Sequence, residues 1–91
     1  LSDLKVDLSL LGANAFSSEE GLTDMDWEIV QVKKAIIRAS KKSAVLSISE
    51  KLNTVQRIRI CDPNQISYLI TELNPDDPLL TSYKKNDLQV L

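Results

Sequence analysis

The sequence contains no histidine and only one cysteine, Cys61. A single cysteine cannot form a disulfide within the chain, which fits a reducing compartment, so we expect a cytoplasmic protein. With no histidine to act as its base, Cys61 is interpreted as a small buried hydrophobic residue and not as a nucleophile. The sequence offers no metal site or cofactor motif, and we expect neither a metal nor a cofactor.

Long apolar runs are also absent. No stretch approaches the roughly 20 apolar residues that a helix needs to cross a bilayer. Residues 1–10 lack the basic start and the continuous apolar run of a signal peptide. We therefore expect no membrane partner. The chain begins at Leu1 without an initiator Met, and we expect it to be a piece of a longer protein.

An excess of positive charge is missing too, since 11 basic residues face 13 acidic ones and the formal net charge is −2. Such a balance gives no attraction for the phosphate backbone of DNA, so these residues are not expected to bind it. Hydrophobic residues make up 43% of the chain and charged residues 26%, as in ordinary globular proteins. We expect residues 1–91 to form a single folded domain, or part of one.

Period-two alternation near the start of the chain predicts a strand over residues 5–11. The next segment, residues 12–23, has little periodicity and many turn-forming residues, and it predicts an ordered loop. The apolar face of the strand is formed by Val6, Leu8 and Leu10.

A helix is predicted from about residue 24 to residue 40. Thr23 and Asp26 resemble a capping box, and acidic residues near this end suit the positive end of a helix dipole. Basic residues gather toward the other end, in agreement with the chain direction. The apolar stripe of this helix is predicted to consist of Val32, Ala35, Ile36 and Ala39.

The second half of the chain predicts three strands, a short helix and a last strand. Asp62, Pro63 and Asn64 form a turn between two of these strands, and Asn86 is expected to end the helix. The resulting order is β-α-β-β-β-α-β, which favours an α/β fold with three layers and a largely parallel sheet flanked by helices. The strands are expected at residues 44–48, 54–61, 66–71 and 88–91, and the helix at residues 78–85.

Five segments carry a family resemblance, in order and with compatible spacing: VDLSLLGANAF, GLT, VKKAI, LSISEKLN and ISYLITEL. Together they resemble the C-terminal effector-sensing domain of DeoR-family bacterial repressors. The resemblance implies a fold similar to ribose-5-phosphate isomerase and glucosamine-6-phosphate deaminase, with a pocket at the carboxyl ends of parallel strands. It also implies a phosphorylated sugar as effector, a homo-oligomer, and operator DNA bound only through a winged helix-turn-helix domain that these residues do not include.

The chain departs from the family pattern at four places. Asn14 stands where the family more often has Asp, and Ile48 where the strand normally ends in Asp. Glu72 replaces the Asp of the family's L-I-T-D, and residues 52–53 read Leu-Asn in place of Phe-Gly. The fold is expected to tolerate these changes, but the resemblance does not predict which sugar phosphate binds.

The predicted effector-binding residues are Gly12, Asn14, Thr23, Lys33 and Lys51. Gly12 would let the backbone approach a ligand, and Asn14 and Thr23 would pair with its hydroxyls. The two lysines would supply positive charge to an anionic group. A purely structural interpretation stays open for each residue: Gly12 as a turn residue, Thr23 as a helix cap, and the lysines as solvated charges.

Acidic residues near the start of the predicted helix, including Glu19, Glu20 and Asp24, would repel a phosphate from its N-terminus. The resemblance instead implies a phosphate loop that precedes Leu1, so this chain is expected to supply the wall of the pocket that contacts hydroxyls. Two aromatic residues, Phe16 and Trp27, are candidates for stacking on a sugar ring. For Trp27 we favour packing at the start of the helix.

Three functions remain: a ligand sensor, an enzyme of the isomerase or deaminase type, and an oligomerisation module without a ligand. Ribose-5-phosphate isomerases, whose fold the resemblance implies, carry an acidic residue in the counterpart of the GAN turn and a Glu just before the helix lysine. This chain has Asn14 and Val32 at those two places. The absence of histidine removes the usual acid/base of the deaminases. We therefore expect a sensor and no enzymatic activity, and a Lys33→Ala variant is expected to weaken effector binding without unfolding the domain.

Overall fold

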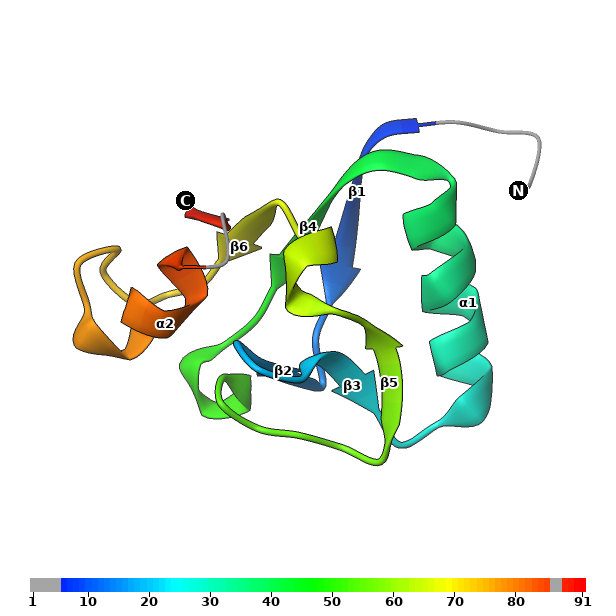
Figure 1. The fold of residues 1–91 in the computed structure, drawn as a ribbon, viewed down its shortest axis with the longest axis horizontal. Helices are drawn as coiled ribbons and strands as arrows, with labels where there is room; N and C mark the ends of the chain where they lie inside the picture. The colour runs from blue at the N-terminus through cyan, green and yellow to red at the C-terminus, as the bar shows by residue number, and fades with distance from the viewer. Residues whose placement is uncertain (1–5, 86–87) are drawn as a thin grey trace.

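The computed structural model describes residues 6–85 and 88–91 and has a mixed α/β architecture with two sheets (Figure 1). The predicted α/β class and the parallel sheet are confirmed. The more detailed prediction of an isomerase-like topology remains a prediction. The predicted helix end at Asn86 lies outside the described residues.

The larger sheet is parallel throughout and has the strand order β1-β4-β6-β7. Its central register aligns Leu10 with Ala44 and Ala44 with Tyr68. Because the strands are parallel, the residues that follow β1, β4 and β6 all lie at one edge of the sheet. The strand bounds are β1 Val6–Gly12, β4 Ser40–Leu46, β6 Tyr68–Ile70 and β7 Gln89–Val90.

The smaller sheet is antiparallel and joins β2 (Ala15–Ser17), β3 (Gly21–Asp24) and β5 (Ile58–Cys61) in that order. The predicted loop over residues 12–23 is therefore wrong in part, because β2 and β3 form a hairpin there. Gly21 has φ +84, which a glycine adopts without strain at the end of the hairpin turn. The observed order is β-β-β-α-β-β-β-α-β, and the predicted strand at residues 54–61 is reduced to β5, outside the parallel sheet.

Helix α1 (Trp27–Arg38) begins three residues later than predicted. Its N-cap is Asp26, whose carboxylate accepts hydrogen bonds from the backbone N–H groups of Glu28 and Ile29 at 2.9 and 3.3 Å. The predicted cap, Thr23, belongs to β3 instead. The predicted apolar stripe is wrong in part: Ala39 is buried and Ile36 packs against the core, but Val32 is 57% exposed. Val30, outside the predicted stripe, is fully buried.

Residues from both sheets and from α1 form one hydrophobic core. Leu11, Val45 and Leu69 come from the parallel sheet, and Phe16 and Leu22 come from the antiparallel one. The core also holds Cys61 as a free, buried thiol, so the interpretation of this residue as a small hydrophobe is confirmed.

The face of the parallel sheet that points away from the hydrophobic core carries exposed apolar side chains. The alternation predicted for β1 is present, but Val6, Leu8 and Leu10 are 44%, 55% and 60% exposed. Their neighbours Ser9 and Leu11 are buried instead. Parallel sheets are ordinarily covered on both faces, so this apolar face, completed by Leu46 at 49% exposure, is unusual for an isolated domain.

The C-terminal segment folds as a 3₁₀ turn, Pro78–Leu80, followed by the single-turn helix α2 (Thr81–Lys84). Asp77 caps the turn by accepting a hydrogen bond from the backbone N–H of Leu79 at 2.9 Å. Leu80 and Tyr83 are fully buried and attach this segment to the core. None of the helices within the described residues is long and apolar enough to cross a membrane.

Candidate functional site

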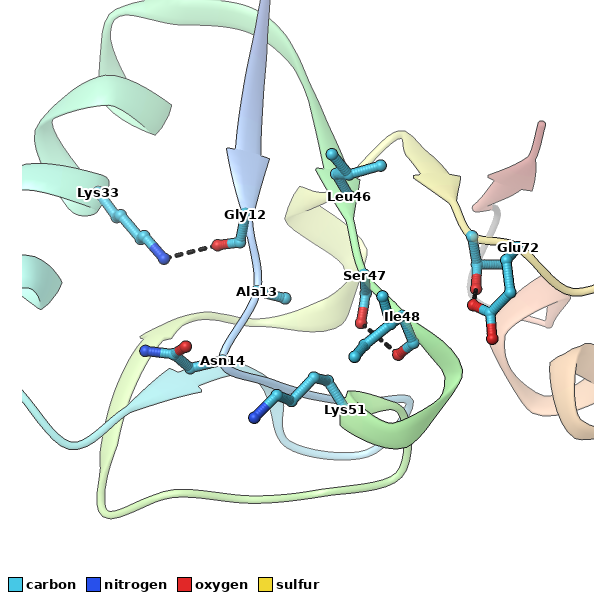
Figure 2. A pocket seen from close by; sticks show the side chains of 10 residues that line it. Gly12, Ala13, Asn14, Lys33, Leu46, Ser47, Ile48, Lys51 and Glu72 are labelled. Atoms are coloured by element: carbon cyan, nitrogen blue, oxygen red, sulfur yellow. Dashed lines mark hydrogen bonds between the residues drawn. The ribbon is translucent and has the colours of Figure 1, made fainter.

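A pocket of about 600 Å³ opens at the carboxyl edge of the parallel sheet (Figure 2). Its walls come from the segments that follow β1, β4 and β6, and from α1. This is the edge at which open α/β sheets bind their ligands. The lining residues are Gly12, Ala13, Asn14, Lys33, Leu46, Ser47, Ile48, Lys51, Thr71 and Glu72.

Four of the five predicted site residues, Gly12, Asn14, Lys33 and Lys51, line this pocket together. The fifth, Thr23, does not line it: its side chain is buried within β3, and its hydroxyl accepts a hydrogen bond from the backbone N–H of Gln56 at 2.8 Å. The structure therefore gives Thr23 a structural role that links β3 to the segment before β5.

Asn14 is held in place by a buried carboxylate. Its side-chain amide donates to Asp24 at 2.8 Å, and Asp24 also accepts from the backbone N–H groups of Met25 and Asp26 at 2.7 and 3.1 Å. Burial by itself raises the pKa of Asp24, but these hydrogen bonds and the charge of Lys33 outweigh it and lower the pKa below its ordinary value. Asp24 is therefore an anion that orients the Asn14 amide.

Lys33 reaches from α1 to the end of β1, where its ammonium donates to the carbonyl oxygen of Gly12 at 2.6 Å (Figure 2). The same ammonium lies 4.0 Å from the Asp24 carboxylate, and the Lys33 side chain is only 17% exposed. The interpretation of Lys33 as a solvated surface charge is wrong, because its side chain is mostly buried and its ammonium is hydrogen-bonded to the protein backbone. Lys33 closes one wall of the pocket and ties α1 to the parallel sheet.

Lys51 presents a different cation to the same pocket. It ends a 3₁₀ turn, Ser49–Lys51, and its side chain is exposed. Among residues 6–85 and 88–91 its ammonium has no hydrogen-bond or ion-pair partner. It also lines a smaller adjoining hollow together with Asn14 and Asp24. Lys51 is thus the cation of this pocket that remains available to an anionic ligand.

Glu72 brings a carboxylate to the far wall of the pocket, at the end of β6. This carboxylate accepts from both the backbone N–H and the hydroxyl of Ser49, at 2.9 and 2.5 Å, and from the hydroxyl of Thr71 at 3.0 Å. The hydrogen bond from the Ser49 side chain is the main cause that lowers the pKa of Glu72. Glu72 therefore stays ionised and is committed to the turn that carries Lys51.

Two residues important for this arrangement were missed as site residues by sequence reasoning, namely Asp24 and Ser49. The sequence indicates Asp24 only as a negative charge near a helix start, and no pattern in it distinguishes Ser49 from other polar residues. Asp24 follows the GLT motif directly and Ser49 lies within LSISEKLN, so their places within quoted motifs were the available signal.

The two aromatic candidates for stacking do not lie in the pocket. Phe16 is fully buried in the core, where its ring packs against Tyr83 with centroids 5.3 Å apart. Trp27 is at the start of α1, but it is 62% exposed, so the preferred interpretation of it as a packing residue is wrong. The pocket thus combines an amide, a glycine backbone, a free ammonium and hydroxyls without an aromatic platform.

Comparison with known proteins agrees with the motifs. The family of the DeoR C-terminal sensor domain matches residues 1–73. A curated relative, the glycerol-3-phosphate regulon repressor of Haemophilus influenzae, is 30% identical over 71 residues. That match covers 78% of this chain but only 28% of the repressor, so the chain spans well under half the length of its relative. Because the family match includes most of the chain, the protein belongs to the DeoR C-terminal sensor domain family.

Proposed function

We propose that this chain forms part of the effector-sensing domain of a DeoR-type transcriptional repressor and binds a phosphorylated sugar or polyol. The observation that carries the proposal is the pocket at the carboxyl edge of β1, β4 and β6, where Lys51 offers an uncommitted ammonium beside Asn14. Its volume of about 600 Å³ lies within the usual range of small-molecule sites, roughly 300–1,000 Å³.

The chemistry of the lining residues supports this ligand class. The Asn14 amide gives one N–H to Asp24 and keeps its carbonyl oxygen and second N–H for a ligand hydroxyl. Lys51 supplies charge for an anionic group, while Gly12 leaves open space at its Cα. Lys33 is proposed to contribute through the Gly12 carbonyl that it holds, with its positive charge directed mainly at Asp24.

A small polyol phosphate is the first ligand to test. The name of the curated relative associates that repressor with glycerol 3-phosphate. A compound of this kind has what the pocket can read, namely an anionic group for Lys51 and hydroxyls for Asn14. A main phosphate contact from polypeptide outside residues 1–91 is compatible with this assignment.

The proposed mechanism is a shift of population between two states of the full-length repressor that differ in affinity for operator DNA. DNA would be bound by a separate N-terminal domain, since these residues carry a net charge of −2. We propose a cytoplasmic homo-oligomer for the full-length protein.

An isomerase or deaminase would need a carboxylate base free to move a proton, but Asp24 and Glu72 are both committed to protein hydrogen bonds.

Residues 1–91 are proposed to make up only part of the sensing domain. The exposed apolar face of β1, with Leu8 and Leu10 more than half exposed, is suited to cover by further polypeptide of the same repressor. The much greater length of the curated relative supports this assignment. In a longer chain whose additional residues cover this apolar face, we expect the β1 amides to be better protected from hydrogen exchange than in residues 1–91 alone. Equal protection in the two proteins would contradict the proposal that residues 1–91 are only part of the domain.

The function is tested by thermal-shift measurements on the full-length repressor with a panel of sugar and polyol phosphates, including glycerol 3-phosphate. A ligand at 100 times its dissociation constant should add about 2.7 kcal/mol to stability. Lys51→Ala should reduce the shift, and Lys41→Ala is the matched control, because Lys41 is exposed and lies outside the pocket. If no phosphorylated compound produces a shift, the sensor proposal is wrong and the oligomerisation module without a ligand is the alternative that remains.

A further inference from the structure

The turn that carries Lys51 is attached to the rest of the protein at both of its ends. We define the Lys51 loop as residues 47–54, between β4 and β5. We propose that Glu72 and Tyr83 are positioning residues of the effector site, which hold this loop so that the Lys51 ammonium faces the pocket. The inference rests on the proposed function, and neither residue needs to touch the effector.

The first attachment is the Glu72 carboxylate, which uses both of its oxygens on Ser49. One oxygen accepts the backbone N–H of Ser49 at 2.9 Å and the other accepts its hydroxyl at 2.5 Å. A two-point contact of this kind fixes orientation as well as distance. It sets the start of the 3₁₀ turn two residues before Lys51.

The second attachment is the Tyr83 hydroxyl, which accepts the backbone N–H of Asn53 at 2.7 Å. The same hydroxyl lies 3.0 Å from the Phe16 carbonyl oxygen and 2.9 Å from the side-chain oxygen of Asn53, so its single proton has an acceptor on either side. Tyr83 is fully buried, and Asn53 has φ 59, a left-handed conformation that asparagine tolerates. This hydroxyl therefore fixes the backbone two residues after Lys51.

Contacts inside the loop connect the two attachments to Lys51 itself. The Thr54 hydroxyl donates to the Lys51 carbonyl oxygen at 2.6 Å, and Leu52 is buried in the core. The backbone of Lys51 is consequently fixed on both sides, and only its long side chain remains free. Binding an anion then costs the ordering of that side chain alone, and not of the whole loop.

The assignment extends the site beyond the part of the chain that the family match covers. That match ends at residue 73, whereas Tyr83 is in α2. Helix α2 and the 3₁₀ turn before it thus have a use in the site that the family match does not indicate. A chain that lost Tyr83 would keep all the lining residues of the pocket but would lose the anchor of its Lys51 loop.

The test is a double-mutant cycle on the full-length repressor, with glycerol 3-phosphate and inorganic phosphate as probes in isothermal titration calorimetry. Glu72→Ala and Tyr83→Phe should each weaken binding about three- to tenfold when Lys51 is present. In a Lys51→Ala background, neither should cause a further loss, because their effect passes through Lys51. Additive losses in the two backgrounds would overturn the positioning role.

Two variants separate positioning from other effects. Glu72→Gln keeps an oxygen for Ser49 but removes the charge, so it should restore part of the affinity lost in Glu72→Ala. If Glu72 only repelled the anion, both variants would bind the anion more tightly than wild type.

Tyr68→Phe is the control for Tyr83→Phe, since it removes a tyrosine hydroxyl outside the pocket and should leave affinity unchanged. Amide exchange at residues 49–53 should increase in Tyr83→Phe, and unchanged exchange there would count against the attachment. If wild type binds neither probe, the cycle is run with the sugar or polyol phosphate of the panel that gives a thermal shift; if no compound of the panel binds, the proposed function fails first and this inference fails with it.

Discussion

The side-chain amide of Asn14 donates a 2.8 Å hydrogen bond to the buried carboxylate of Asp24, and this contact joins the end of β1 to the end of β3. The Asp24 side chain is only 3% exposed and accepts two further hydrogen bonds from backbone N–H groups. The pocket wall and the start of α1 therefore depend on one anion.

Replacing this anion should destabilise the whole domain. Asp24→Ala leaves the Asn14 amide and two backbone N–H groups without their acceptor and the Lys33 ammonium without its ion-pair partner. We expect a loss of about 3 kcal/mol in the free energy of unfolding. Asn14→Ala, which removes one donor at a more exposed position, should cost about 1 kcal/mol. Urea unfolding followed by circular dichroism measures both. Equal losses would show that Asp24 is not the centre of this contact.

The same carboxyl gives a prediction for acid. Because the folded pKa of Asp24 is lower than its ordinary value of 3.8, the unfolded state binds a proton first as the pH falls. The stability that Asp24 contributes is therefore present above pH 3.8 and is lost below it, as the pH falls through the folded pKa. The stability difference between wild type and Asp24→Asn should shrink over that range. A difference that stays constant from pH 7 to pH 3 would contradict the lowered pKa.

The two glycines of the chain should respond differently to substitution. At Gly21, an added Cβ would lie 2.1 Å from the carbonyl oxygen of Cys61, and φ is +84, so Gly21→Ala should cost at least about 2 kcal/mol. At Gly12 nothing lies within 4 Å of an added Cβ, so Gly12→Ala should change stability by less than about 0.5 kcal/mol. Thermal melts of the two variants make the comparison. A comparable loss in both would mean that the hairpin does not approach β5 as closely as described.

Lys33 gives a prediction that revises the one drawn from sequence. Its ammonium donates to the Gly12 carbonyl oxygen and faces Asp24, so Lys33→Ala should lower the free energy of unfolding by about 1–2 kcal/mol. Lys41→Ala is the control, because its ion pair with Asp7 is highly exposed and should contribute less than about 0.5 kcal/mol. Chemical denaturation of both variants checks this. If Lys33→Ala is as stable as Lys41→Ala, the contacts of the Lys33 ammonium with Gly12 and Asp24 do not stabilise the domain.

The sequence predicted the elements with clear periodicity and missed those too short to show any. Helix α1 and strands β1, β6 and β7 were predicted at nearly their observed positions, and β4 begins four residues before its predicted start. In contrast, β2 has three residues and β3 four, which is less than a pattern needs. Thr23 and Asp26 are both residue types that cap helices. The sequence could not show that the Thr23 hydroxyl binds the backbone of Gln56, 33 residues away.

The face of a strand that meets the core is also a tertiary property. The alternation of β1 was predicted correctly, yet the face with Leu8 and Leu10 is exposed and the face with Leu11 is buried. In the site, Gly12, Asn14, Lys33 and Lys51 line one pocket, and their binding of an effector stays a prediction. The pairing of Glu72 with Ser49 joins residues 23 positions apart, and no local pattern encodes it.

Cys61 gives a last prediction, at alkaline pH. Burial raises the pKa of its thiol from 9.0 to about 11, so the unfolded thiol loses its proton first as the pH rises. The stability tied to the protonated thiol is complete below pH 9 and is lost between pH 9 and about 11. Cys61→Ala has no thiol to titrate, so the stability difference between wild type and this variant should fall by about 2–3 kcal/mol across that interval. Urea unfolding of both proteins at pH 8, 9 and 10 tests the slope, and parallel curves would mean that the thiol is open to solvent in the folded protein.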